Sequence, residues 1–384
     1  MPTKKEFIKK ILIEGIFSSN TFLYWKARVG LYALLKTMDI KEGDEVILPA
    51  YTCVVVPNAI LYLGAKPVYV DVSADSYNMD IDNVKTAITN RTKVIICQNT
   101  YGLSTDLEEL TALAKQHNLF TIEDCTHGFG GTYNGIPNGL SCDAAIYSTQ
   151  WNKPFSTGIG GFVVTKNNAI AKKLSALDKD LIEPSTKEQR KLKALYFVKR
   201  YLLHDFNYWP MVSLYRWLSH NTPLVVGSSS SGEINSTTMP EDYFKGFSDI
   251  QAKEGLKNIG QLTQDLVKRK ESAHIYTGFL AKQGKNHVDK KWFSNHSFLK
   301  YPLLVKKRDD FMVLAEKNHI KLGEWFISPL HPVQGDLSAW NFESGKFPNA
   351  EYLASHVVNL PTTPSDINKI LSFLATHSAF IVDI

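Results

Sequence analysis

Four side chains that could do acid–base or covalent chemistry follow two apolar segments of the chain. Asp124 and His127 come at and after the end of TIED, and Ser148 and Lys153 come at and after the end of AAIYS. These groups can move protons, and an amine can also bond to a carbonyl group. Lys153 stands just before the glycine-rich segment TGIGG, where an ordinary solvent-facing lysine would have no evident purpose.

The segment KARVGLYALL supplies a place for an anion. Its pattern predicts a helix that begins near Ala27 and Arg28. The first backbone amides of a helix have no partner within it, so they can hold a phosphate group.

A lysine, a carboxylate and a helix-start phosphate site are together what pyridoxal phosphate requires. The lysine forms the Schiff base, the carboxylate keeps the ring nitrogen protonated, and the amides with a nearby hydroxyl hold the phosphate. Each feature alone is commoner in a structural role: a strand-end aspartate, a solvated loop lysine, a turn histidine. Their order and spacing together favour the cofactor.

The elements that must position these residues alternate between strand and helix from residue 27 to 165. An α/β fold follows, with a mainly parallel sheet flanked by helices and ligands at the carboxyl ends of the strands. We expect a large domain over residues 1–235, with an aromatic helical insert at about 168–225, and a smaller α+β domain over 236–384. Strands are predicted at 46–50, 66–72, 92–98, 119–125, 144–149 and 160–165, and helices at 31–39, 57–65, 80–88 (capped by Asp80) and 106–117.

Composition narrows the classes of protein. The 384 residues carry a mixed net charge of +5, which gives no reason to expect nucleic acid. The four cysteines have neither CxxC spacing nor a nearby histidine cluster, so we expect reduced cytoplasmic thiols and no metal site. The uncharged run 46–65 contains two prolines and divides better into a strand and a helix than into a membrane span.

Longer stretches resemble the DegT/StrS-type nucleotide-sugar aminotransferases, which are fold-type-I pyridoxal phosphate enzymes. The resemblance covers about residues 26–165 and resumes from about 239 to the end. It is carried by EGDEVILPAYTCVVVPNAILYLGAKPVYVDVSADSYNMD, RTKVIICQNTYG, TIEDCTHGFGGTYNG, YSTQWNK, TGIGGFVVT, SDIQAKEGL, PLHPVQG and VVNLPTTPSDINKI.

The resemblance implies a role for each residue around the cofactor ring. Lys153 matches the Schiff-base lysine, and its being lysine argues against the relatives that have histidine there and act as dehydratases. Asp124 matches the partner of the ring nitrogen. His127 matches the position that contacts the phenolic oxygen, and Thr126 matches the small residue beneath the ring.

The phosphate site and the ring-stacking position depart from the family pattern. Ser148 matches the phosphate-binding serine, and Ala27 and Arg28 match the pair of amides, although a usual glycine pair is replaced. The family often stacks an aromatic residue on the cofactor from the position of Cys53, so Tyr51 or another ring must substitute. DYFKGF stands near residue 244, where the family has an asparagine that reaches the neighbouring subunit's phosphate.

By the same resemblance the protein is a homodimer that moves an amino group, from glutamate, to a keto group of a nucleotide-linked sugar. The setting would be surface polysaccharide (O-antigen) or amino-sugar biosynthesis. Two alternatives stay open: an aminotransferase for a non-sugar or lipid-linked ketone, and a regulatory protein that binds the cofactor without turnover. The aromatic insert is either a hairpin packed on the protein or, over 192–218, a surface for a membrane-near substrate.

Overall fold

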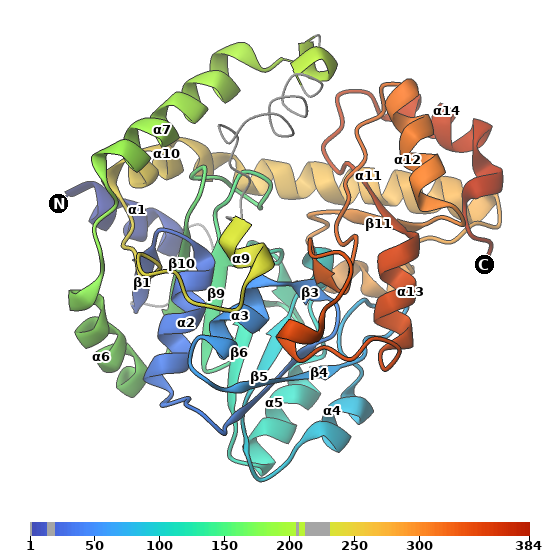
Figure 1. Cartoon of the computed structure of the whole chain (residues 1–384). Coiled ribbons are helices and arrows are strands. Elements are labelled where there is room, and N and C mark those ends of the chain that lie inside the picture. The colour runs from blue at the N-terminus through green and yellow to red at the C-terminus, as the bar shows by residue number, and fades with distance from the viewer. Residues whose placement is uncertain (1, 14–19, 205–206, 212–230) are drawn as a thin grey trace.

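Seven strands form one sheet in the computed structural model, which describes residues 2–13, 20–204, 207–211 and 231–384 (Figure 1). The order across the sheet is β1-β10-β9-β6-β5-β2-β4; the neighbours from β9 to β4 are parallel, and β10 and β1 add antiparallel pairings at one edge. The bounds are β1 (Thr21–Tyr24), β2 (Glu45–Pro49), β4 (Lys66–Val70), β5 (Thr92–Gln98), β6 (Phe120–Asp124), β9 (Ala144–Ser148) and β10 (Gly161–Thr165). The predicted α/β fold with a mainly parallel sheet is confirmed.

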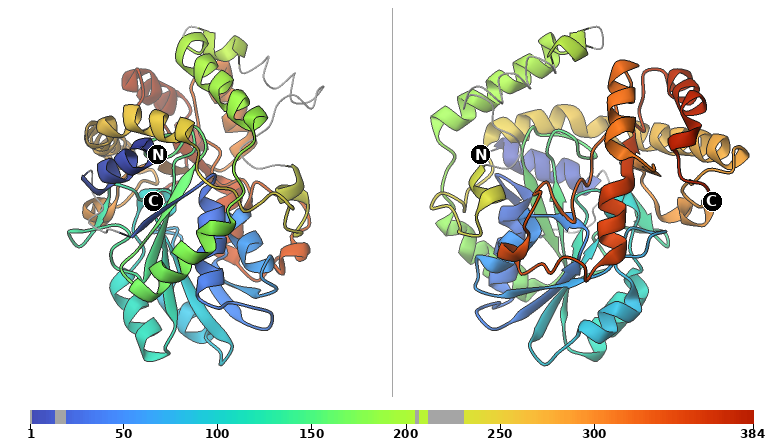
Figure 2. Two further views of the ribbon diagram at one scale, coloured as in Figure 1. Left: turned by 90° about the vertical axis from the view of Figure 1, so that its left-hand side faces the viewer. Right: turned by 45° about the vertical axis from the view of Figure 1, so that its right-hand side comes forward.

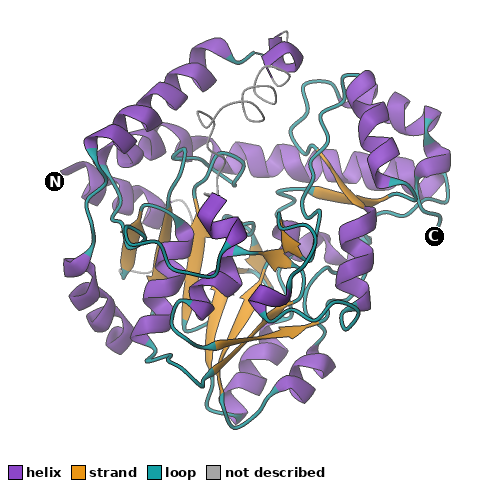
Figure 3. Cartoon of the chain, viewed as in Figure 1, coloured by secondary structure: helices purple, strands orange, loops and turns teal. Residues whose placement is uncertain are grey.

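Helices cover both faces of this sheet (Figure 3). Successive side chains of a strand point to opposite faces, and in β2 Val46 and Leu48 join the core under α2 and α3 while Ile47 joins the core under α4 and α5. The Asp80 side chain accepts the amides of residues 82 and 83, as its predicted role as a helix cap requires. The helices are α2 (Ala27–Thr37), α3 (Val55–Leu61), α4 (Ile81–Ala87) and α5 (Leu107–Gln116).

A second hydrophobic core lies in the C-terminal part of the chain. It is built by β11 and β13, which pair in antiparallel fashion, and by the long helix α11 with α12 and α14. The segment between α12 and β13 returns to the first core, where it packs through Phe326, Leu330 and Trp340. There β12 pairs in parallel with β3. The expected boundary at residue 236 stays a prediction. The bounds are β3 (Thr52–Cys53), α11 (Leu262–Lys282), β11 (Tyr301–Leu304), α12 (Arg308–Lys317), β12 (Leu330–His331), α13 (Pro348–His356), β13 (Val357–Leu360) and α14 (Ile367–Thr376).

The insert begins as helices on the outside of the molecule. After α6 the chain forms α7, which runs along the periphery near α10 and ends in a π-helical turn, η3 (Figure 2). Residues 205–206 and 212–225 of the predicted insert lie outside the described residues. No helix in the described part of the chain is long and apolar enough to span a bilayer. The remaining bounds are α1 (Pro2–Ile13), β7 (Thr132–Tyr133), β8 (Ile136–Pro137), α6 (Asn168–Leu177), α7 (Thr186–Phe197), η3 (Val198–Leu202), α9 (Ser231–Asn235) and α10 (Asp249–Asn258).

Candidate active site

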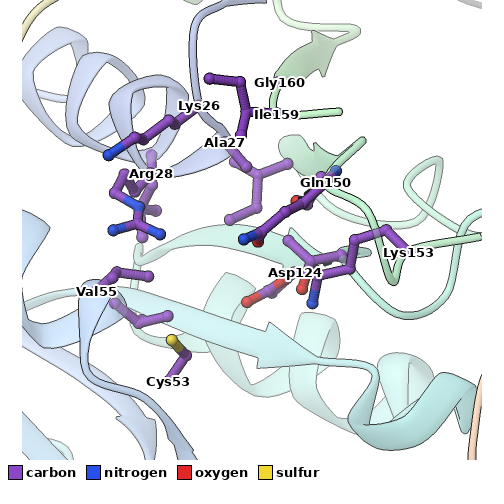
Figure 4. A pocket seen from close by; sticks show the side chains of 15 residues that line it. Lys26, Ala27, Arg28, Cys53, Val55, Asp124, Gln150, Lys153, Ile159 and Gly160 are labelled. Carbon is purple, nitrogen blue, oxygen red and sulfur yellow. Dashed lines mark hydrogen bonds between the residues drawn. The ribbon is translucent and has the colours of Figure 1, made fainter. Parts of the chain in front are cut away.

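The carboxyl ends of β6 and β9 meet the first turn of α2 at one cavity (Figure 4). Lys26 and Arg28 lie on one side of it, and Asp124, Gln150 and Lys153 lie on the other. An adjoining space of about 310 Å³ shares Asp124 and Lys153 and reaches to the C-terminal segment. Of the residues expected from the sequence, the two cavities bring together Ala27, Arg28, Asp124, Thr126, His127, Ser148 and Lys153.

Lys153 combines a reactive group with an environment that favours its neutral form. Burial lowers the pKa of its ammonium to about 8; Lys300 and Arg28 act in the same direction, and Cys53 and Asp124 oppose them. Its Nζ lies 4.3 Å from the centroid of the Trp325 ring. At pH 7 about a tenth of this lysine is therefore an uncharged amine, far more than for an ordinary lysine, and this is the form that attacks a carbonyl or takes a proton.

Asp124 is buried at the end of β6, and its Oδ1 accepts the backbone N–H of Thr126 at 3.0 Å. Burial raises the pKa of this carboxyl, while Thr126 and the positive charge of Lys153 pull it down. A cationic partner in the cavity would therefore lower the pKa of Asp124 and stabilise its ionised form, and the attraction would be strong because the site holds little water.

His127 is held as a neutral imidazole. The backbone N–H of Tyr101 donates to its Nδ1 at 3.1 Å, so the ring proton belongs on Nε2. Burial, aided by the charges of Lys153 and Lys300, lowers the pKa of His127 well below its usual value. The ring stacks on Trp325, with centroids 4.9 Å apart and planes 5° from parallel. Its Nε2–H is thus a fixed donor.

The start of α2 is suited to a phosphate. Its N-cap residue, Lys26, gives no side-chain cap to the first amides, and no acidic residue lies in the first turn. β10 approaches the helix start closely, since a Cβ added at Gly161 would lie 2.3 Å from Cα of Ala27. Any larger residue would push the helix start away, which explains the last glycine of TGIGG. Ser148, almost fully buried, lines the same cavity.

A carboxylate that the sequence pattern did not reveal pairs with Lys26 and Arg28 at the start of α2. Glu233, in α9, pairs with Arg28 at 2.7 Å and with Lys26 at 3.2 Å. The Asn58 amide donates to the backbone carbonyl of Glu233 at 2.7 Å and so fixes its segment. The start of α2 would therefore offer a phosphate a guanidinium that is already oriented, in addition to the backbone amides expected there.

At residues 53 and 244, where the sequence differs from the family pattern, other residues make the contacts. Tyr51 is fully buried, with its hydroxyl 2.7 Å from that of Tyr101, and it is not among the residues that line the two cavities. Cys53 lines both, and Trp325 and Phe326 are the aromatic residues that line the larger one. In DYFKGF, the Tyr243 hydroxyl donates to the backbone carbonyl of Arg28 at 3.0 Å and thus supports the start of α2 from within the chain.

Sequence reasoning missed the residues that reach the site from distant segments. Trp325 and Lys300 come from the C-terminal part, and Lys300 Nζ lies 5.3 Å from the Trp325 ring centroid. His331 pairs with Cys53 across β12 and β3; burial, helped by Lys153, lowers its pKa to about 3. The quoted motif PLHPVQG contains His331 and was the one available signal. Nothing in the sequence pattern pointed to Glu233.

The donor set fits pyridoxal phosphate. Arg28, Ser148 and the amides at the start of α2 would hold the phosphate, and the buried carboxylate of Asp124 would pair with the ring nitrogen. The amine of Lys153 would be the covalent attachment point, and the Nε2–H of His127 would be a donor beside it.

The model of the DegT/DnrJ/EryC1/StrS aminotransferase family matches residues 26–206 and 243–369. The chain belongs to this family. It is a pyridoxal-phosphate-dependent aminotransferase. It is 30% identical over 341 residues to the GDP-perosamine synthase of Escherichia coli O157:H7, covering 89% of this chain and 80% of that one.

Solved structures agree in fold. The chain superposes on a DegT DnrJ EryC1 StrS aminotransferase from Brucella abortus with a TM-score of 0.75, at 21% identity, over 98% of this chain and 90% of that one. It also matches ntda from Bacillus subtilis, solved with bound cofactor PMP, with a TM-score of 0.69 at 21% identity over 93% and 72% of the two chains.

Proposed function

We propose that this aminotransferase moves an amino group from glutamate to a keto group of a nucleotide-linked sugar, in surface polysaccharide (O-antigen) or amino-sugar biosynthesis. The observation that carries the proposal is the meeting of Lys153, Asp124 and the cationic helix start of α2 in one cavity. The acceptor class is supported by the relative whose name specifies a GDP-linked product.

When bound, the cofactor supplies an electron sink for the carbon that loses its proton. Asp124 keeps the ring nitrogen protonated. Lys153 would serve as the base that takes the proton from the substrate carbon and returns it, because its lowered pKa makes the neutral amine far more abundant than in an ordinary lysine. His127 is the rival base, but its Nδ1 already accepts the Tyr101 N–H, so it serves better as a fixed donor.

Spectroscopy of the purified holoenzyme tests both halves of the reaction. Addition of glutamate should convert the visible absorption band to that of the aminated cofactor, and a keto sugar nucleotide should restore it. Glutamine and alanine serve as competing donors. A protein that never converts would favour the regulatory alternative. Conversion by glutamate without recovery by any keto sugar nucleotide would contradict the proposed acceptor.

A lipid-linked ketone is the second candidate for the acceptor. Apolar side chains are exposed along α7 and η3, near the cavity: Leu195, Phe197, Tyr201 and Leu202. Recovery of the band by a prenyl-linked keto sugar, and not by a nucleotide-linked one, would favour it.

We also propose a cytoplasmic homodimer. The family resemblance supports it. Light scattering after size exclusion should give twice the chain mass at micromolar concentration. A monomer that retains cofactor and activity would contradict the dimer and leave the reaction standing.

A further inference from the structure

The active-site cavity continues past Lys153 into a second chamber. This chamber has a volume of about 570 Å³ and is bounded on one side by the loop after β9 and on the other by α7. It shares Lys26, Gln150, Lys153 and Trp325 with the cofactor cavities, so a single ligand could reach from the reacting amine into it.

One face of α7 forms the outer wall. The residues that line the chamber from this helix and its extension recur every three or four positions, with Lys191 and Leu192 as an adjacent pair. Such spacing places side chains on one side of a helix. They are Glu188, Lys191, Leu192, Leu195 and Lys199.

The wall is fixed to the body of the protein at several points. The Tyr196 hydroxyl donates to the backbone carbonyl of Thr157 at 2.6 Å. Near the other end of the helix, Lys245 pairs with Glu188 at 2.6 Å, and beyond its last turn Arg200 pairs with Glu254 at 2.6 Å. The chamber is therefore a formed space and not a chance gap beside a loose helix.

The chamber is positively charged. Lys191 and Lys199 line it from the wall, and the Nζ of Lys199 stands 4.2 Å from the centroid of the Trp151 ring. Within the described ranges, neither lysine has a carboxylate at ion-pair distance. Glu188, the carboxylate that lines the chamber, is held by Lys245. A ligand anion would thus meet two cations that need not first be released from a carboxylate of the described chain.

We propose that this chamber binds the diphosphate-bearing part of the amino acceptor, with the diphosphate on Lys191 and Lys199 and the attached group against Trp151, Leu192 and Leu195. The proposal rests on the proposed function, because it places the acceptor's keto carbon at Lys153. Lysines give point-like contacts to phosphate oxygens, and the indole and leucines give an apolar surface to what the diphosphate carries.

Direct binding of UDP and GDP to the holoenzyme tests the proposed diphosphate site on α7 without turnover. Calorimetry should show binding that weakens with added salt, and each of Lys191→Gln and Lys199→Gln should weaken it about tenfold. The matched control is Lys193→Gln, an exposed lysine of the same helix that does not line the chamber; it should bind like the parent protein. Equal affinities in all variants, or equal loss in the control, would overturn the proposal.

The source of the diphosphate is settled by comparing UDP and GDP with farnesyl diphosphate and UMP. Stronger binding of the nucleoside diphosphates assigns the chamber to nucleotide-linked acceptors, and stronger binding of farnesyl diphosphate assigns it to lipid-linked ones. UMP binding as tight as UDP, or no binding of any diphosphate, would contradict the diphosphate site. Conversion of the cofactor by glutamate should be unchanged in Lys191→Gln and Lys199→Gln. A wrong diphosphate site and a wrong reaction would therefore give different results.

Discussion

The two walls of the cavity are built in different ways. The strand-end wall takes Asp124 and Ser148 from adjacent parallel strands, both nearly inaccessible to water. The α7 wall comes from outside the sheet and is held by a few polar contacts; Leu195, which lines the chamber, is 40% exposed. A rigid, desolvated wall suits the chemistry common to both halves of a transamination, and a peripheral wall suits selection of one partner. Variants of the first wall should therefore damage both half-reactions, and variants of the second only the acceptor half.

The largest effect is expected for Lys153→Ala. Loss of the attachment point and of the base should lower the rate with glutamate by about 10⁴-fold and remove the visible band of covalently held cofactor. Lys300→Ala is the matched control, because burial lowers the pKa of Lys300 also to about 8 and it too lies over Trp325. The control should keep the band; a band retained in Lys153→Ala would move the attachment elsewhere.

Asp124→Asn should lower both half-reactions by roughly 10²- to 10³-fold, because a neutral amide cannot stabilise the protonated ring nitrogen. Some cofactor should remain bound through Arg28 and Ser148, which equilibrium dialysis can measure. If only the acceptor half-reaction slowed, the proposal that the strand-end wall serves both half-reactions would be wrong.

The rate at which Lys153 captures the cofactor should rise about tenfold per pH unit below its pKa. The amine of Lys153 reacts when neutral, so capture of cofactor by the cofactor-free protein should accelerate with pH and level off above about 8. Because Asp124 raises the pKa of Lys153, Asp124→Asn should move the break to lower pH. Stopped-flow absorbance between about pH 6 and 9.5 measures this; a rate still rising throughout would indicate an ordinary lysine.

The smallest effect concerns the α7 wall. Tyr196→Phe removes the hydrogen bond to Thr157, worth about 1 kcal/mol, and should raise the acceptor KM a few-fold without changing the donor half-reaction. Tyr201→Phe, at a ring that is 59% exposed, is the control and should change neither. An altered rate with glutamate in Tyr196→Phe would mean that the walls are not independent.

The same contrast explains what could be predicted from the sequence. Asp124, Ser148 and Lys153 stand at strand ends recognisable from local patterns, and parallel strands bring such ends to one edge of a sheet. The cap at Asp80 is equally local. Glu233 lies 207 positions from Lys26, and no periodicity tells which distant carboxylate meets a given cation. Trp325 and α7 likewise reach the cavity only through tertiary packing.

The parallel pairing of β12 with β3 also bears on synthesis of the protein. It brings His331 beside Cys53, so the cavity is completed by a segment that leaves the ribosome long after Lys153. At ~5–20 residues per second the interval is on the order of ten seconds or more. A nascent chain halted in this interval would display Lys153 and Asp124 without their C-terminal cover. Its lysine would be more open to water, so its pKa would lie closer to that of a surface amine until the C-terminal cover is made.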